Sequence, residues 1–202
     1  MKKLHLKIAE NIQGEFVPKE INIMIVFQVN CPGCIASALP MVQNLYETYG
    51  NEIGVVGLST AFQYYDKNNA ENTKRLVEEG YLVGHSLEIM EQHGHHKLPY
   101  KITFPVLMDE KMNSDNKDEV AQMILENHPS YPQFQDGEKP MAKKRIIDHL
   151  DKQSDVFITF SVNQFRGSPT FVLFDKEHQI INTWFGHQQK ATIIDAINAS
   201  KN

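Results

Sequence analysis

Apolar residues in the N-terminal half of the chain follow two kinds of pattern. Residues 21–29 (INIMIVFQV) and 53–60 (IGVVGLST) are nearly continuous in apolarity and rich in branched side chains, which is typical of strands buried on both faces. Between them, apolar positions recur every three or four residues, as in an amphipathic helix: Ile35, Leu39, Val42, Leu45, Tyr46 and Tyr49. We expect this helix to end at Gly50 and to be kinked at Pro40.

Two further segments extend this alternation of strands and helices. Leu4, Leu6 and Ile8 alternate with polar residues, which predicts a short strand. Residues 67–79 have helical spacing, and Gly80 follows them as a stop signal. The order strand, helix, strand, helix predicts parallel pairing with right-handed crossovers, and therefore an α/β fold.

The C-terminal part has a different pattern. Residues 169–175 (PTFVLFD) and 180–186 (IINTWFG) flank a polar turn and predict a β-hairpin, in which we expect Trp184 to belong to the core. A helix closes the chain and carries Ile193, Ile194 and Ile197 on one face.

Between the two parts lies a longer connection. Residues 104–109 predict a short strand, and residues 111–154 predict two helices joined by a loop rich in Pro and Gly. The apolar faces of these two helices are narrow, so we expect them to lie on the surface.

Composition narrows the function classes. The chain has 202 residues and a net charge of -5, and its tight basic cluster at 143–145 is more typical of a solvated helix face than of a nucleic-acid site. The apolar run at 23–27 is far shorter than the ~18 residues of a membrane span. The lysines at the start are not followed by the apolar stretch of an export signal. We therefore expect no nucleic-acid or membrane partner and a cytoplasmic location.

The two cysteines of the chain, Cys31 and Cys34, stand in the motif CPGC between the first buried strand and its helix. With Cys31 at the N-cap and Pro32 at the first helical position, backbone N–H groups and the helix dipole would stabilise a Cys31 thiolate. Its pKa should then fall below the free value of about 8.5. Cys34 lies one turn further on the same side, so we predict a nucleophile, Cys31, and a resolving thiol, Cys34.

Two other interpretations of the cysteine pair compete with redox chemistry. Zinc usually takes four ligands, and no second cysteine pair is present. The clustered candidates for further ligands are His93, His95 and His96, which are more typical of a surface loop. Inert buried thiols are the second alternative, and the position at a helix start argues against it.

The combination of CPGC after a buried strand with FRGSPTFVLF (165–174) far downstream resembles the thioredoxin superfamily. The arrangement is most similar to its thiol-disulfide interchange (TlpA-like) and redoxin branch. The resemblance covers roughly residues 4–62, 102–109 and 155–200, and Gly186 also matches a family position. It implies a thioredoxin-like α/β fold, with a central mixed sheet flanked by helices.

The resemblance also implies a function and a site. Cys31 and Cys34 would be the catalytic pair of a thiol-disulfide oxidoreductase that acts on protein thiols and disulfides with an unidentified electron donor. Pro169 would be cis and face the cysteines, and the backbone of Ser168 would pair with a bound substrate strand. No cofactor or metal is required, because the disulfide carries both electrons. We expect one domain over residues 1–202, with an inserted helical segment at about 111–154.

The sequence departs from the family pattern at several positions, which include the Pro-Gly pair between the cysteines. Asn30 stands where the family often has an aromatic residue before the first cysteine. Ile25 occupies the position of the buried acid of thioredoxin, so the proton-transfer group is open. The helix proline of the family lies one residue earlier than Pro40.

Three rival functions remain. A thiol peroxidase of the peroxiredoxin type needs a proline and a Thr or Ser at set distances before its reactive cysteine, and Met24 and Gln28 occupy those positions. A copper carrier would hold Cu(I) with Cys31, Cys34 and a histidine such as His187. A binding scaffold with vestigial cysteines would use the inserted helices and show no turnover.

Overall fold

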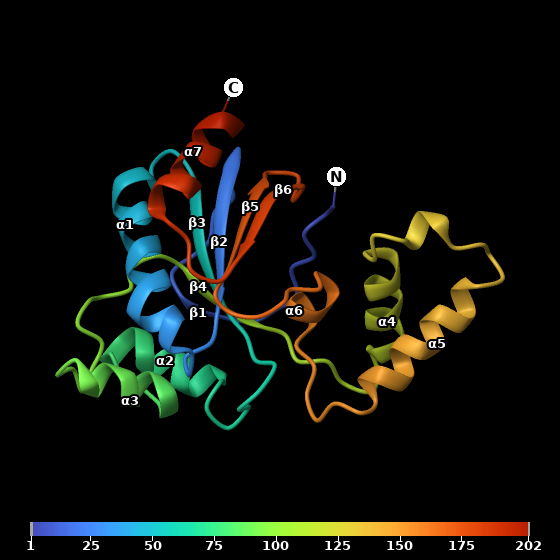
Figure 1. Cartoon of the computed structure of the whole chain (residues 1–202), viewed down its shortest axis with the longest axis horizontal. Helices are drawn as coiled ribbons and strands as arrows, with labels where there is room; N and C mark the ends of the chain where they lie inside the picture. Colours follow the sequence, from blue (N-terminus) through green and yellow to red (C-terminus); the bar gives the residue numbers. More distant parts are fainter. Residues whose placement is uncertain (1, 202) are drawn as a thin grey trace.

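The structure of the chain, a computed structural model, describes residues 2–201 (Figure 1). The strands are β1 (Ile8–Gln13), β2 (Ile21–Phe27), β3 (Gly54–Ser59), β4 (Val106–Asp109), β5 (Thr170–Asp175) and β6 (Ile180–Phe185). The α-helices are α1 (Leu39–Tyr49), α2 (Ala70–Glu79), α3 (Gly84–Gln92), α4 (Lys117–Glu126), α5 (Lys139–Leu150), α6 (Ile158–Val162) and α7 (Lys190–Ser200). A π-helical turn, η1 (Cys34–Ala38), precedes α1, and a 3-10 turn, η2 (Tyr131–Gln133), lies between α4 and α5.

The strands form one mixed sheet in the order β1-β4-β3-β2-β5-β6. The central strands β2, β3 and β4 are parallel, as the alternation of strands and helices predicts, and β1, β5 and β6 pair antiparallel with their neighbours. Thr170 of β5 is in register with Val26 of β2. The residue before Thr170 therefore lies at the carboxyl end of β2, the same end from which the CPGC segment leaves the sheet.

Helices cover both faces of the sheet (Figure 1). Alternate side chains of β2 point to opposite faces, so Ile23 and Ile25 pack with α1, α2, α3 and α7, while Met24 packs towards the opposite face. Trp184 packs, half-buried, against the first of these two clusters. Among residues 2–201, no helix is both long and apolar enough to cross a bilayer.

Helices α4 and α5 stand to one side of the sheet (Figure 1). They lie where the sequence predicts two surface helices. Their apolar side chains pack with each other and with α6 in a separate cluster that includes Val120, Leu150 and Val162. This segment therefore has a small core of its own and joins the sheet through α6.

The structure corrects the predicted N-terminal strand. The strand begins at Ile8 rather than near Leu4, and its antiparallel partner is β4. Side chains satisfy the backbone of the preceding residues, because His5 N–H donates to Asn163 Oδ1 and Lys7 N–H donates to Thr159 Oγ1. Leu4 and Leu6 pack under the sheet ahead of the ladder, which starts at Ile8 opposite Asp109.

Two helices, α3 and α6, have no counterpart among the predicted elements. Neither begins with a local side-chain cap. The Oδ1 of Asn30 accepts the N–H of His85 in the first turn of α3 at 2.7 Å. The carboxylate of Asp109 accepts the N–H groups of Thr159 and Phe160 at the start of α6, at 2.8 and 3.0 Å. Both caps come from distant parts of the chain, which a local pattern does not reveal.

Candidate active site

The CPGC segment forms the start of the helix after β2. Cys31 immediately precedes the first helical residue, Pro32, as predicted. The Cys31 carbonyl accepts the N–H groups of Cys34 and Ile35 at 3.0 and 3.1 Å, and its sulfur accepts the Cys34 N–H at 3.2 Å. The side chain of Cys31 thus acts as the N-cap of the helix, where free N–H groups favour a negative charge.

The two thiols differ sharply in their surroundings. Cys31 is half-buried, whereas Cys34 is 0% exposed. Hydrogen bonding from the Cys34 thiol is the main cause that lowers the pKa of Cys31 to about 6. The Ser168 side chain and the N–H groups of Cys34 and Gly33 add to this effect and together outweigh burial. Burial and the bond to the Cys31 sulfur raise the pKa of Cys34 well above its usual value.

Ser168 and Pro169 lie against the cysteines, as the resemblance implies. The Ser168–Pro169 peptide bond is cis. In its thiol form, Cys31 donates a long hydrogen bond of 3.6 Å to the Ser168 carbonyl. Pro169 is buried beside Gly33, where a methyl group built on the Gly33 Cα would lie 3.9 Å from the proline ring. The sequence elements 31–34 and 168–169 therefore meet at one site.

The expected irregularity near Pro40 takes the form of the π-helical turn η1. There the Leu39 N–H donates to the Cys34 carbonyl, five residues back, instead of to Ile35. A π-helical turn accommodates one residue more than an α-helical turn. Because Pro40 has no N–H, the Ile35 carbonyl lacks a helical partner. The Tyr100 hydroxyl donates to it instead, at 2.5 Å.

Tyr100 comes from the irregular segment before β4, and no motif in the sequence singles it out. Burial, followed by the nearby Cys34, raises its pKa above the usual range. The hydroxyl therefore keeps its proton and remains a donor at neutral pH. Its bond to the Ile35 carbonyl fixes the peptide between Ile35 and Ala36, one residue beyond Cys34, although the hydroxyl makes no bond to either sulfur among the contacts of residues 2–201.

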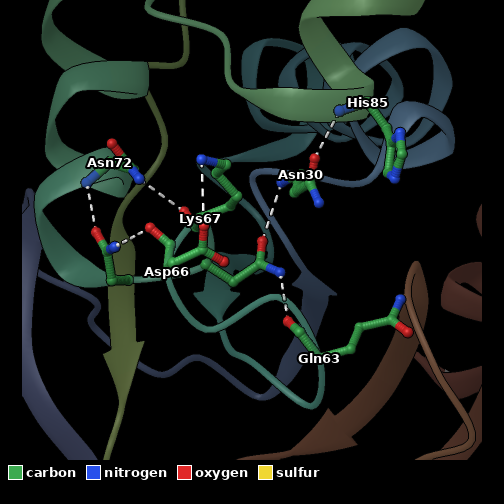
Figure 2. A network of polar contacts seen from close by, with 8 residues as sticks. Asn30, Gln63, Asp66, Lys67, Asn72 and His85 are labelled. Atoms are coloured by element: carbon green, nitrogen blue, oxygen red, sulfur yellow. Dashed lines mark hydrogen bonds and ion pairs between the residues drawn. The ribbon is translucent and has the colours of Figure 1, made fainter.

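Asn30, noted from the sequence only as a departure, is a junction of polar contacts (Figure 2). Its N–H donates to Asn68 Oδ1 at 3.0 Å, while its own Oδ1 caps α3 at His85. The Asn68 amide donates in turn to the Gln63 carbonyl at 2.8 Å. These bonds tie the residue before Cys31 to α3 and to the loop after β3, and an aromatic side chain at position 30 would lose the cap on α3.

Cys31 opens into a cleft of about 490 Å³. Besides the segment around Cys31, its walls come from four parts of the chain: the loop after β3, the start of α3, the segment that leads to Pro169, and the end of β6. Tyr64, His85 and Phe185 form the rim and are about half exposed, at 51%, 53% and 50%. The cleft thus has aromatic edges around the more acidic of the two thiols. No motif in the sequence singles out these three residues.

The position of the missing acid is filled by an apolar core residue, because Ile25 is fully buried between its neighbours in β2. A buried acid does occur at the end of β4. Burial raises the pKa of Asp109 to about 6, but its oxygens are engaged by the Thr60 hydroxyl and the start of α6. Asp109 is therefore a structural cap and no substitute for a proton acceptor at Cys34.

The residues of the metal-binding and peroxidase alternatives do not assemble. Among residues 2–201, no three histidine, cysteine or carboxylate side chains gather as a metal site. His187 bonds to the Ser37 hydroxyl at 2.9 Å, and His93, His95 and His96 are exposed after α3. Met24 lies in the core, and Gln28 is a buried amide that bonds to Ser168, at 3.4 Å.

Comparison with known proteins gives matches by structure alone. No protein-family model matches the chain, and no curated protein is similar to it in sequence. A thiol-disulfide isomerase from Corynebacterium glutamicum matches with a TM-score of 0.59 and 17% identity, over 98% of this chain and 94% of that chain. A thioredoxin-like superfamily protein matches with a TM-score of 0.60 and 16% identity, over 98% and 96% of the two chains.

A third solved structure, a thioredoxin-like protein in its oxidised form, matches with a TM-score of 0.53 and 13% identity over 98% of this chain. These alignments extend almost end to end, so they also span the region of α4 and α5. At such identities the likeness concerns the course of the backbone. Together with the mixed sheet and the CPGC helix start, it shows that the chain has the thioredoxin-like fold.

Proposed function

We propose that this protein is a thiol-disulfide oxidoreductase that uses Cys31 and Cys34 on protein substrates. The observation that carries the proposal is the asymmetry of the pair. A half-buried free thiol with a pKa of about 6 is hydrogen-bonded to a fully buried free thiol whose pKa is raised. Cys31 is thus an ionised nucleophile at neutral pH, and Cys34 stays protonated until the second step.

The geometry supports a two-step exchange. The Cys31 thiolate attacks one sulfur of a substrate disulfide, a mixed disulfide forms, and the first substrate sulfur leaves as a thiolate that takes up a proton. Cys34 then loses its proton and attacks the Cys31 sulfur. The second substrate thiol leaves, and a Cys31–Cys34 disulfide remains. The substrate has gained two electrons and two protons, and a dithiol donor must restore the enzyme.

The backbone beside the site suits an extended polypeptide. The Ser168 carbonyl lies at the mouth of the cleft next to Cys31, and the cleft is open along its aromatic rim. A substrate strand that bonds to Ser168 would bring its cysteine to the Cys31 sulfur. This supports protein thiols and disulfides as substrates, while the electron donor and the direction of exchange depend on the reduction potential.

The trapping of mixed disulfides tests the proposal. In Cys34→Ser, the first step stays intact and the second is blocked, so covalent complexes with protein substrates accumulate and disappear on reduction. Cys31→Ser should abolish both turnover and trapping. If Cys31→Ser traps substrates and Cys34→Ser does not, the assigned roles are reversed. If neither variant loses disulfide reduction relative to wild type, the cysteine pair is not the active centre.

The direction of exchange is measured by equilibrating the pair with glutathione buffers. A potential of about -270 mV would make the protein a reductant, and one of about -120 mV would make it an oxidant. Failure of the two thiols to form a disulfide in any of these buffers would contradict the proposal and favour the binding-scaffold alternative.

A further inference from the structure

A second hollow lies beside the Cys31 cleft and has a volume of about 720 Å³. Its walls are α5, the segment after it, the end of α6, and the loop after β3. The floor is apolar and mostly aromatic: Phe62, Tyr65, Ile146, Leu150, Phe157 and Phe160. The volume is within the range of pockets that bind small ligands or several side chains. Neither the thiol chemistry nor the fold requires this hollow.

The edge of the hollow carries two positive charges that form no ion pair among residues 2–201. Arg145 and Lys152 are exposed in its lining, and among residues 2–201 neither side chain forms an ion pair. By contrast, Lys143 and Lys144 on the same helix pair with Asp118 and Asp148. The carboxylate in the lining, Asp155, is engaged by Lys111. The charges in the lining that have no ion-pair partner, those of Arg145 and Lys152, are therefore positive and complementary to an acidic group.

The hollow and the cleft at Cys31 are neighbours that share a lining residue. The side chain of Phe62 lines both, and it stacks on Phe160 with the ring centroids 4.6 Å apart. The segment from Gln164 to Ser168 also contributes to both hollows, with Gln164 and Phe165 in one and Arg166 to Ser168 in the other. A chain bound at Cys31 can therefore continue past Phe62 into the second hollow.

We propose that the hollow binds an acidic, aromatic segment of the protein substrate, next to the cysteine that reacts with Cys31. The inference rests on the proposed oxidoreductase function and adds the substrate class. The aromatic side chains of this segment pack on the floor, and its carboxylates face Arg145 and Lys152. Burial of apolar area supplies affinity, and the opposite charges supply selectivity.

The test uses synthetic peptides with one cysteine, linked as a mixed disulfide to glutathione. The first peptide carries a segment that contains Phe and Glu. It is made in two versions, with this segment before or after the cysteine. A second has Lys in place of Glu, and a third has Ser in place of Phe. Reduction of each releases the peptide thiol and glutathione and leaves the Cys31–Cys34 disulfide, and dithiothreitol then restores the enzyme.

We expect wild-type kcat/KM for the Phe/Glu peptide to exceed that for the Lys version by about tenfold, mainly through KM. The preference should be lost in the double variant Arg145→Glu/Lys152→Glu. It should persist in Lys144→Glu/Lys176→Glu, which changes the net charge equally at exposed sites outside the hollow. The Ser version should also bind more weakly than the Phe version.

Reduction of a small, uncharged aliphatic disulfide, bis(2-hydroxyethyl) disulfide, separates the two proposals. It should be equal in all three proteins, because this substrate does not reach the second hollow. Normal reduction without any preference among the peptides would overturn the inference while the proposed function stands. An equal loss of preference in the Lys144/Lys176 control would also overturn it, by showing a net-charge effect. Absence of reduction with every substrate would refute the proposed function itself.

Discussion

Removal of the Tyr100 hydroxyl offers a sharp test of how the helix at the cysteines is built. Tyr100→Phe keeps the ring in the core and deletes the donor that serves the Ile35 carbonyl. Because the Leu39 N–H is taken by Cys34 and Pro40 has no N–H, this carbonyl finds no replacement in the helix. Ile35 is itself fully buried, so water has poor access to the orphaned group.

The expected cost follows from the penalty for an unsatisfied buried acceptor, which is about 1–3 kcal/mol. The middle of this range, a decrease of about 2 kcal/mol in the free energy of unfolding, corresponds to a fall of roughly 4–8 °C in Tm for a chain of this size. Urea denaturation of the reduced protein gives the free energy of unfolding. Tyr46→Phe is the matched control, because the Tyr46 ring packs on the same core and its hydroxyl has no bonded partner among residues 2–201.

A double-mutant cycle with Pro40→Ala isolates the cause. Ala restores an N–H five residues after Ile35, the spacing that a π-helical turn uses. The cost of Tyr100→Phe should then shrink by at least about 0.5 kcal/mol in the Pro40→Ala background. An identical cost in both backgrounds would refute the idea that the tyrosine compensates for the proline. A control variant as unstable as Tyr100→Phe would assign the loss to the ring environment instead.

Two further predictions concern the residues around the nucleophile. The rate of Cys31 alkylation by iodoacetamide should rise with pH around a midpoint of about 6, because the thiolate is the reactive form. In Cys34→Ala this midpoint should shift to higher pH, because the hydrogen bond that contributes most to the low pKa of Cys31 is gone. A wild-type midpoint of about 8.5 would contradict the N-cap argument. Asn30→Ala should lower the free energy of unfolding in urea by about 1–2 kcal/mol, because the His85 N–H at the start of α3 loses its cap. A decrease below ~0.3 kcal/mol would show that water replaces the cap.

The elements that the sequence determined are those whose signal is local. A buried strand is recognisable from its continuous apolarity, as in 21–29, and a helix from its spacing and stop residue. Gly80, for example, ends α2 with a φ of 69°, a conformation that favours glycine. The CPGC helix start is local too, because the N-cap and the N–H groups it accepts lie within three residues. The position of Pro169 followed from a motif, and the sheet register places it at the cysteines.

Tertiary structure decided whatever depends on partners far apart in the chain. Helix α3 begins where Asn30 supplies a cap, and α6 begins where Asp109 does, so their own sequences gave no start signal. Tyr100 serves Ile35 from 65 positions away. The cleft and the second hollow exist because the loop at Phe62 meets α6 and α5. Hydrogen bonds and packing act through space, and only folding brings these groups within reach of one another.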